Sequence, residues 1–374
     1  MVSIIEVRED QRDYWDKEVS RFDLVHPLNA FGWGQVRTIN GWAPTYLMAK
    51  RGGRVSGAIM YMTKRLPGTG LSIMYGQKGP LWETGDRETF NNLLARLKDD
   101  ARLKKAIFLR IDPNMPEEMI ASHDPFTSSG FIHLDHRWSF WNSPRDVVRI
   151  DLEAAGNENE LFDRIDRDAR RCVRKAYKEK VSIRPADSVE ELRRFYDIFK
   201  EFSVVKGFMS RGLAYQESLW KEFISRGDGR LFLAIYEGRI IGGLICLMFG
   251  RKCLAMHMST PYAHQKLQTY YAYVWESIKW AKENDCCWYS FRGAGSSRSQ
   301  EQFKKKFGPE MVRLAGYYDL PFHPMLYRLL YATEFDLLPR IWRLLMKVRE
   351  GCQGVSKLLQ GKQRAAGSLK ALPG

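Results

Sequence analysis

An internal repeat is the feature of this sequence that most constrains its fold. Residues 47–59 (LMAKRGGRVSGAI) resemble residues 232–244 (FLAIYEGRIIGGL). The identical positions share one offset of 185 residues, and they are Ala49 and Ala234, Gly53 and Gly238, Arg54 and Arg239, and Gly57 and Gly242. Each segment reads as a strand, a glycine-containing tight turn and a second strand, which predicts a β-hairpin. The chain is therefore expected to contain one folding unit twice.

The segments that follow the two hairpins correspond in order. The predicted elements are a strand at 71–75 and 254–259, a helix at 88–104 and 269–284, and a closing strand at 106–111 and 288–291. In both helices the apolar residues recur every three or four positions, as on one buried face.

Hairpin, strand, helix and strand in this order resemble the acetyltransferase-like (GNAT) fold. The predicted fold class is α/β (α+β, mixed sheet) with two tandem GNAT-like domains. We place domain 1 at residues 1–145 and domain 2 at 146–320, where a strand at 147–152 completes or bridges the domains. Residues 321–374 are predicted to form a basic helical C-terminal extension with a flexible end.

Composition agrees with two domains and indicates the kind of partner. A chain of 374 residues exceeds what one hydrophobic core usually supports. Lys and Arg number 59 against 44 Asp and Glu, a net charge of +15, which favours a polyanionic partner such as RNA, DNA, an anionic membrane or a phosphorylated substrate. No signal peptide or apolar run of membrane-spanning length is present, so we expect a cytoplasmic protein. The six cysteines lack zinc spacing, so no metal site is expected.

The sequence argues against a coenzyme A site. GNAT units hold the pyrophosphate with a glycine-rich loop at the start of the helix after the third strand, because backbone N–H groups must approach it closely. Residues 261–269 (PYAHQKLQT) contain no glycine, and residues 81–87 (LWETGDR) contain one glycine and two acids. We therefore expect no nucleotide cofactor, and a plain acetyl-CoA transferase is a minority interpretation.

Phrases between about residues 25 and 335 resemble the Fem family (FemA, FemB, FemX) of peptidoglycan-bridge aminoacyltransferases, which consist of two GNAT-like domains. The matching phrases are Trp33-Gly-Gln-Val-Arg37, Phe108-Leu-Arg-Ile-Asp-Pro113, Arg170-Arg-Cys-Val-Arg-Lys-Ala176 with Val181-Ser-Ile-Arg184, Arg211 with Tyr215, and Phe303-Lys-Lys-Lys-Phe-Gly308. No single phrase is specific, but their order and spacing together are fairly specific.

The resemblance implies transfer of an amino acid from aminoacyl-tRNA to the stem-peptide amine of lipid II or its UDP-linked precursor. It implies that Arg37 and Arg211 contact the diphosphate of the precursor, that Lys304 with Phe303 serves the transfer, and that Asp112 lies near the acceptor amine. Aminolysis of an activated ester requires no metal or nucleotide cofactor. A cation such as Lys304 can stabilise the oxyanion, and a carboxylate such as Asp112 can accept a proton.

Each of these residues also has an ordinary structural interpretation. Lys304 lies in a run of three lysines that solvent can hydrate, and an Asp before Pro, as at Asp112, commonly starts a turn. Arg37 and Arg211 can form phosphate contacts or ordinary ion pairs. Tyr215 is more often a core aromatic than a contact to a base or sugar.

The sequence also departs from the family pattern. The family's Tyr-Asp-Phe-Gly-Gly-like strand end reads Tyr289-Ser-Phe-Arg-Gly293, and its aromatic-rich third strand reads Ala255-Met-His-Met258, so a changed donor or acceptor stays open. His257 is interpreted as a core histidine. The coiled-coil arm of some members is absent, because a strand and one helix fill the space between Ala176 and Arg211.

Two basic surfaces are predicted. One is a helix near residue 170, whose cations are candidates for binding tRNA phosphates, above all Arg170, Arg171, Arg174 and Lys175. The other begins at Arg340, and from there to the end of the sequence eight cations oppose one acid and apolar residues recur at helical spacing. That pattern is typical of a basic amphipathic helix on an anionic membrane. A docked helix with a disordered end is a nearly equal alternative.

The sequence thus predicts a tandem GNAT-like, Fem-type aminoacyltransferase. We expect it to be a monomer in the cytoplasm, with a peripheral position on the inner membrane face as an option that the basic tail leaves open. Its expected partners are aminoacyl-tRNA and lipid II or UDP-MurNAc-pentapeptide, and it acts in cell-wall cross-bridge formation. The alternatives are a GNAT-like acyltransferase with another donor or acceptor, in exopolysaccharide or lipid modification, and a non-catalytic membrane-associated assembly protein.

Overall fold

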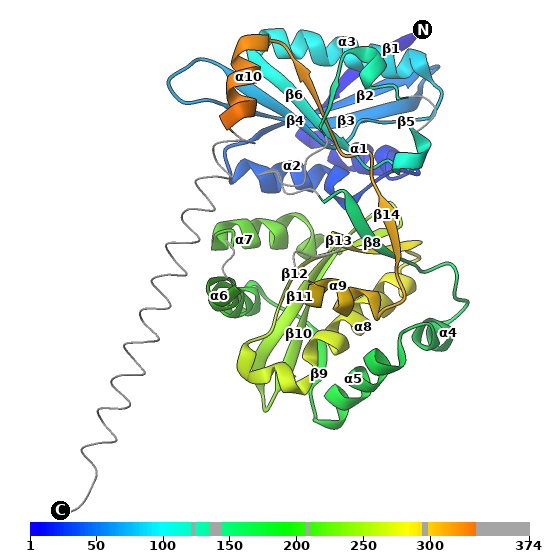
Figure 1. Cartoon of the computed structure of the whole chain (residues 1–374), viewed down its shortest axis with the longest axis vertical. Helices are drawn as coiled ribbons and strands as arrows, with labels where there is room; N and C mark the ends of the chain where they lie inside the picture. The colour runs from blue at the N-terminus through cyan, green and yellow to red at the C-terminus, as the bar shows by residue number, and fades with distance from the viewer. Residues whose placement is uncertain (121–123, 135–143, 207–209, 294–297, 334–374) are drawn as a thin grey trace, which may run out of the picture. The chain divides into compact units, whose positions relative to one another are not determined.

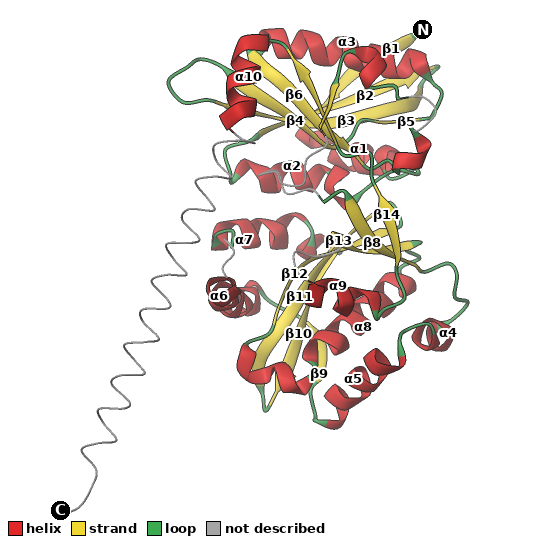
Figure 2. Ribbon diagram, in the orientation of Figure 1, coloured by secondary structure: helices red, strands yellow, loops and turns green. Residues whose placement is uncertain are grey.

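The computed structural model describes residues 1–120, 124–134, 144–206, 210–293 and 298–333, and it contains two mixed β-sheets (Figures 1 and 2). The first sheet has the order β1-β2-β3-β4-β6-β15-β7, with β5 paired to β3. Its strands are β1 (Val2–Val7), β2 (Ala43–Arg51), β3 (Arg54–Arg65), β4 (Ser72–Lys78), β5 (Leu81–Trp82), β6 (Ala106–Pro113), β7 (Ile132–Leu134) and β15 (Tyr317–Pro321).

The second sheet has the order β14-β8-β13-β12-β11-β10-β9. Its strands are β8 (Asp146–Asp151), β9 (Ser182–Pro185), β10 (Gly229–Tyr236), β11 (Arg239–Phe249), β12 (Lys252–Ser259), β13 (Trp288–Gly293) and β14 (Glu310–Arg313). The α-helices are α1 (Arg12–Val19), α2 (Phe31–Thr38), α3 (Arg87–Leu103), α4 (Glu158–Asp163), α5 (Arg167–Lys178), α6 (Val189–Lys206), α7 (Leu213–Glu222), α8 (Thr269–Glu283), α9 (Arg298–Lys305) and α10 (Pro324–Ala332).

The repeat is visible in the backbone. Both hairpins have a register shift at the equivalent position, between Ala49 and Lys50 in β2 and between Ala234 and Ile235 in β10. The helix predicted after each third strand is present as α3 and α8, and the closing strands are β6 and β13. β9 and α6 fill the space between Ala176 and Arg211, as predicted. The two halves therefore repeat one order of elements.

Helices cover the outer faces of the sheets and fill the space between them. α3 packs on one face of the first sheet, and α5 and α8 pack on one side of the second (Figure 1). α1, α2, α6 and α7 lie between the sheets. There Trp33 and Tyr215 belong to one hydrophobic cluster with Met48 of β2 and Leu233 of β10. Burial of these side chains stabilises the two halves against each other.

The end of the predicted second domain returns to the first sheet. After β14 joins the second sheet, β15 returns to the first sheet and pairs with β6, from Tyr318 opposite Ile111 to Pro321 opposite Phe108. The buried pair Arg110 and Asp319, joined at 2.8 Å, fixes this return. The proposed division at residue 145 stays a prediction, and residues near 317–321 belong to the first sheet rather than the second.

One difference between the halves concerns the central parallel pair. β4 and β6 stay paired from Ser72 opposite Ala106 to Lys78 opposite Pro113. β12 and β13 pair only from Lys252 opposite Trp288 to Leu254 opposite Ser290, although β12 continues to Ser259. The second sheet therefore opens between these strands, and the first does not.

The C-terminal extension is described only as far as α10. The predicted basic tail from Arg340 onward lies outside the described residues, as does the membrane contact assigned to it. Within the ranges given above, we find no helix with the length and apolar character needed to cross a bilayer.

Candidate functional site

Arg37, Arg211 and Tyr215 lie together between the two sheets. The Arg37 guanidinium, which is 9% exposed, lies 6.0 Å from the ring centroid of Trp33 and 5.7 Å from that of Trp42. Arg211 lies over the ring of Tyr215 at 5.0 Å. Burial, and then the charge of Arg211, lower the pKa of Arg37. The structure thus brings together Arg37, Arg211 and Tyr215, which the sequence assigned to binding of the precursor.

Three buried nitrogen donors in this region have no hydrogen-bond partner among the described residues. They are Arg37 Nε, Asn40 Nδ2 and Gln216 Nε2. Asn40 contacts Arg211 through Oδ1 at 3.4 Å, and Gln216 contacts His257 through Oε1 at 3.2 Å. An unsatisfied buried donor costs about 1–3 kcal/mol. An anionic ligand with several acceptor oxygens would satisfy these donors, so the arrangement is suited to anion binding.

Arg292 belongs to the same basic cluster. It lies at the end of β13, where the register with β8 shifts between Ser290 and Gly293, and its φ is 66°. This left-handed conformation costs a non-glycine residue about 1–2 kcal/mol. A β-bulge typically redirects a side chain. The Arg292 charge contributes to lowering the pKa values of Arg37, His257 and Lys304, so its guanidinium lies among these groups.

Lys304, on α9, is held at the same bulge. Its Nζ donates hydrogen bonds to the carbonyl oxygens of Phe291 (3.2 Å) and Gly293 (2.5 Å), the two residues that flank Arg292. Burial, and then the charge of Arg292, lower the pKa of Lys304 to about 8. An ammonium has three donors, so one N–H of Lys304 is not engaged by the described residues. The two carbonyl groups hold the Lys304 side chain in position. It is therefore not simply a hydrated member of the run of three lysines.

His257 lies in the part of β12 that does not pair with β13. It is half-buried, and burial followed by the charges of Arg292 and Arg211 lowers its pKa to about 3. It is neutral at physiological pH. Its ring lies 5.2 Å from the ring of Phe199, and its Nδ1 lies 3.2 Å from Gln216 Oε1. These contacts agree with the sequence interpretation of a satisfied core histidine.

Asp112 and Phe303 have extensive protein contacts. Asp112 is 3% exposed and accepts hydrogen bonds from Tyr75 Oη (2.9 Å) and the backbone N–H of Lys78 (3.0 Å), while Lys78 Nζ lies 3.0 Å from Oδ2. Phe303 packs against Tyr271 at 5.0 Å and other aromatic rings of the second half. These contacts explain their burial. Their proposed parts in catalysis stay predictions.

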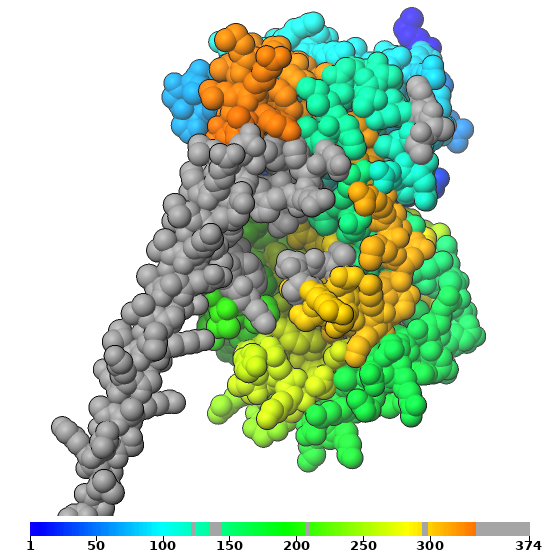
Figure 3. Space-filling model, in the orientation of Figure 1, coloured from blue at the N-terminus to red at the C-terminus, as the bar shows by residue number. Residues whose placement is uncertain are grey.

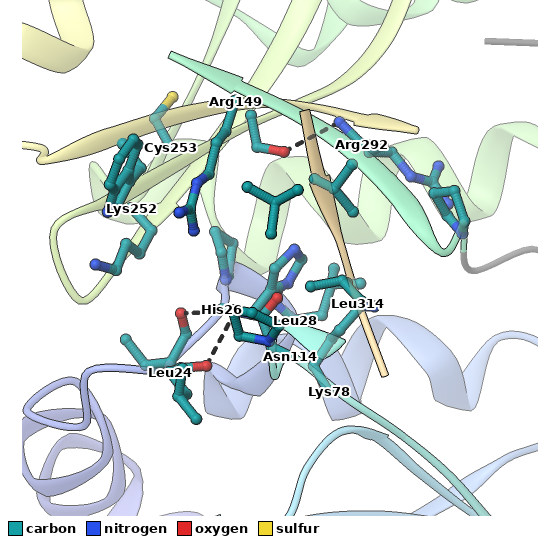
Figure 4. Close-up of a pocket in the computed structure, with 18 of the residues that line it drawn as sticks. Leu24, His26, Leu28, Lys78, Asn114, Arg149, Lys252, Cys253, Arg292 and Leu314 are labelled. Carbon is teal, nitrogen blue, oxygen red and sulfur yellow. Dashed lines mark hydrogen bonds between the residues drawn. The ribbon is translucent and has the colours of Figure 1, made fainter. Parts of the chain in front are cut away.

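A solvent-open pocket with an empty volume of about 870 Å³ lies between the halves (Figure 4). Its lining combines apolar side chains with four cations, Lys78, Arg149, Lys252 and Arg292, against one acid, Asp23. Within the lining, Asn114 fixes the loop before α2 by donating to the carbonyl oxygens of Leu24 and Val25.

The predicted tRNA-binding residues lie on the outer face of α5. This helix buries Ala169, Val173 and Ala176 and leaves most of its cations exposed. In Figure 3 the green part of the chain that contains α5 lies at the molecular surface. Arg170 pairs with Asp163 at 2.6 Å and Arg171 with Asp168 at 3.4 Å. Arg174 lies over the ring of Phe162, and Lys175 is exposed. The cations of α5 therefore lie on the protein surface. They belong to a different helix from Lys304, which is on α9.

Comparison with known families identifies the chain. A family model described as the FemAB family matches residues 16–237 and 236–334. The chain belongs to the FemAB family. A lipid II:glycine glycyltransferase from Staphylococcus aureus is 25% identical to it over 226 residues, which cover 58% of this chain and 53% of that protein. The chain thus spans about half the length of the curated relatives it matches.

Solved structures confirm the fold. The crystal structure of FemX matches 87% of this FemAB-family chain and 99% of its own chain, with a TM-score of 0.79 and 18% identity. A tandem GNAT protein from the clavulanic acid biosynthesis pathway matches 86% and 98%, with a TM-score of 0.50 and 13% identity. The predicted pair of tandem GNAT-like domains is therefore confirmed.

Sequence reasoning missed three residues that the structure places in this site, Asn40, Gln216 and Arg292. Asn40 and Gln216 carry no sequence signal, because what marks them is one buried amide nitrogen each, Nδ2 and Nε2, without a hydrogen-bond partner among the described residues. Arg292 had a signal. It stands at a strand end where the family has glycine, and a charged residue in a position that favours glycine indicates a functional requirement.

Proposed function

We propose that this FemAB-family protein is an aminoacyltransferase that moves an amino acid from aminoacyl-tRNA to the stem-peptide amine of a peptidoglycan precursor. Family membership and the naming of a relative as a lipid II:glycine glycyltransferase support this proposal. The observation that carries it is the group of buried cations and hydrogen-bond donors between the two sheets. Arg37, Arg211 and the unpartnered donors beside them suit the diphosphate of lipid II or of UDP-MurNAc-pentapeptide.

The chemistry follows from the position of Lys304. The acceptor amine, in its neutral form, attacks the ester carbonyl of the donor, and negative charge develops on the carbonyl oxygen. The unengaged N–H of the Lys304 ammonium can donate to that oxygen in a partly buried site, where such a contact is strong. Collapse of the intermediate breaks the ester C–O bond and releases the ribose hydroxyl of tRNA, which takes up a proton. The protein's residues position the reactants and need no metal or nucleotide cofactor for this step.

We place the donor on the second half and the acceptor between the halves. The opening between β12 and β13 leads to Lys304, and the cations of α5 would hold tRNA phosphates by charge rather than by base readout. The pocket of Figure 4 has the mixed apolar and cationic lining that a carboxylate-bearing stem peptide requires. We further propose that the protein acts as a monomer in the cytoplasm and reaches lipid-linked substrate at the inner membrane face.

The experiment that tests this function incubates the purified full chain with a mixture of charged tRNAs and either UDP-MurNAc-pentapeptide or lipid II, and weighs the products. The expected product is heavier than the precursor by one amino-acid residue. Absence of a mass gain with both precursors would refute the proposal. Deacylated tRNA with free amino acids is the control, because it supplies the same components without the activated ester.

A further inference from the structure

One face of the second sheet forms a wall of the pocket in Figure 4. Lys252 of β12 lies opposite Trp288 of β13. Ser290, two residues further along β13, lies opposite Arg149 of β8. Residues that lie opposite each other in paired strands, or two apart in one strand, share a face of the sheet. All four line the pocket, so its wall carries two cations, on the strands that flank the one with the Trp288 ring.

The Arg149 guanidinium is held in a fixed orientation. Its Cζ lies 4.0 Å from the ring centroid of Trp288, and its Nε donates a hydrogen bond to Glu310 Oε1 at 2.6 Å. In Figure 4 the guanidinium is directed into the pocket. Within the described part of the chain, its two Nη groups donate to no acceptor. Two such groups on one edge of a guanidinium match the two oxygens of a carboxylate.

Lys252 adds a positive charge that the wall itself does not neutralise. Its side chain is half-buried, and its Nζ lies 2.9 Å from Cys287 Sγ, which is a weak acceptor. No acid among the described residues forms an ion pair with Lys252, whereas Arg149 has Glu310. The acid of the pocket lining, Asp23, belongs to the loop before α2 and not to this sheet. An anionic ligand group at this wall would therefore meet a bidentate donor and a second cation.

We propose that Arg149 and Lys252 form a subsite that binds a free carboxylate of the acceptor, with Arg149 making the bidentate contact. The inference rests on the proposed function, in which this pocket takes the stem peptide of the precursor, and it extends that function by naming the group that is recognised. A stem peptide has a carboxylate at its C-terminus and another on an acidic residue within it, and both offer the same chemistry. A bidentate contact to one carboxylate fixes the direction of the peptide and so positions its amine for attack.

The chain offers a matched control in Arg251. This residue precedes Lys252 directly, but it does not line the pocket, and its side chain is 61% exposed and pairs with Glu153 at 2.6 Å. Arg251→Gln therefore removes one positive charge beside the proposed subsite without changing the subsite. Arg149→Gln and Lys252→Gln remove one charge each from the subsite itself. Arg149→Lys retains the charge and loses the bidentate geometry of the guanidinium.

The experiment measures by calorimetry the affinity of the full chain for three forms of UDP-MurNAc-pentapeptide: the free acid, the C-terminal amide, and a form amidated on the internal acidic residue. The wild-type protein should bind one of the two amides roughly 10- to 100-fold more weakly than the free acid, and the identity of that amide names the carboxylate. In Arg149→Gln this ratio should fall to about twofold, because the group that distinguishes acid from amide is gone. Lys252→Gln and Arg149→Lys should give intermediate ratios, and Arg251→Gln should give the wild-type ratio. A general structural defect would weaken binding of all three forms and leave the ratio unchanged.

The outcomes separate the two proposals. If the wild-type protein binds the free acid and both amides equally well, the carboxylate subsite is wrong and the proposed function stands. A wild-type ratio that persists in both Arg149→Gln and Lys252→Gln would also overturn the subsite, because the carboxylate would then be bound elsewhere. If the wild-type protein binds none of the three forms, the proposed acceptor is wrong and the subsite fails with it.

Discussion

The electrostatic environment of Lys304 leads to a prediction about stability. Its folded-state pKa is about 8, against an ordinary value of 10.5. Each pKa unit corresponds to about 1.4 kcal/mol, so the protonated lysine costs the folded state at most about 3 kcal/mol, an upper limit because the side chain is partly exposed. Below pH 8 both states keep the proton. Between pH 8 and 10.5 the folded state releases it first, so its free energy of unfolding rises with pH.

Urea unfolding of the wild-type protein and of Lys304→Met, each at pH 7 and pH 9.5, measures this contribution. The wild-type free energy of unfolding should rise relative to that of the variant by about 2 kcal/mol between the two pH values. The neighbouring exposed Lys305 gives the control, since Lys305→Met should follow the wild-type protein. A constant difference between wild type and Lys304→Met at both pH values would refute the partly buried placement of the Lys304 ammonium.

Three further predictions concern other parts of the site. Arg37→Met should raise the free energy of unfolding by roughly 1–2 kcal/mol in chemical denaturation, because it removes a buried cation that forms no ion pair with the residues the structure describes. It should also abolish precursor binding, and lower stability would contradict the anion site. Lys78→Met should lower the free energy of unfolding by roughly 3–5 kcal/mol, because Asp112 loses its buried partner; an unchanged urea midpoint would show that the pair is not buried. Arg171→Ala should weaken tRNA binding and reduce the slope of log affinity against log salt by about 1. Arg102→Ala, equally exposed and also paired three residues away, should leave both unchanged.

The repeated order of elements could be predicted from the sequence because it depends on local patterns. The glycine turns at Gly53 and Gly238 and the periodic apolar residues of α3 and α8 each specify an element without reference to distant residues. The return of β15 to the first sheet could not be predicted in this way. It depends on Arg110 and Asp319, which are about two hundred residues apart and form a buried pair only in the folded chain.

Some charged residues of the candidate site were predictable from the sequence, but their arrangement was not. Motif resemblance identified Arg37, Arg211 and Lys304, because phosphate and oxyanion chemistry restricts the residue types that can serve. The role of Arg292 depends on a one-residue register shift in β13, which no periodicity in the sequence reveals. The unpartnered donor of Gln216 likewise depends on burial by the rest of the fold.

The measurement that most directly tests the central claim is a single-turnover transfer assay. Purified protein is mixed with tRNA carrying a ¹⁴C-labelled amino acid and with UDP-MurNAc-pentapeptide, whose acceptor amine is either free or acetylated, and acetyl-CoA serves as the comparison donor. The account predicts one labelled residue per precursor with the free amine, no transfer to the acetylated amine, and no reaction with acetyl-CoA. Failure of every charged tRNA to label the free-amine precursor, or modification of the precursor by acetyl-CoA alone, would contradict the account.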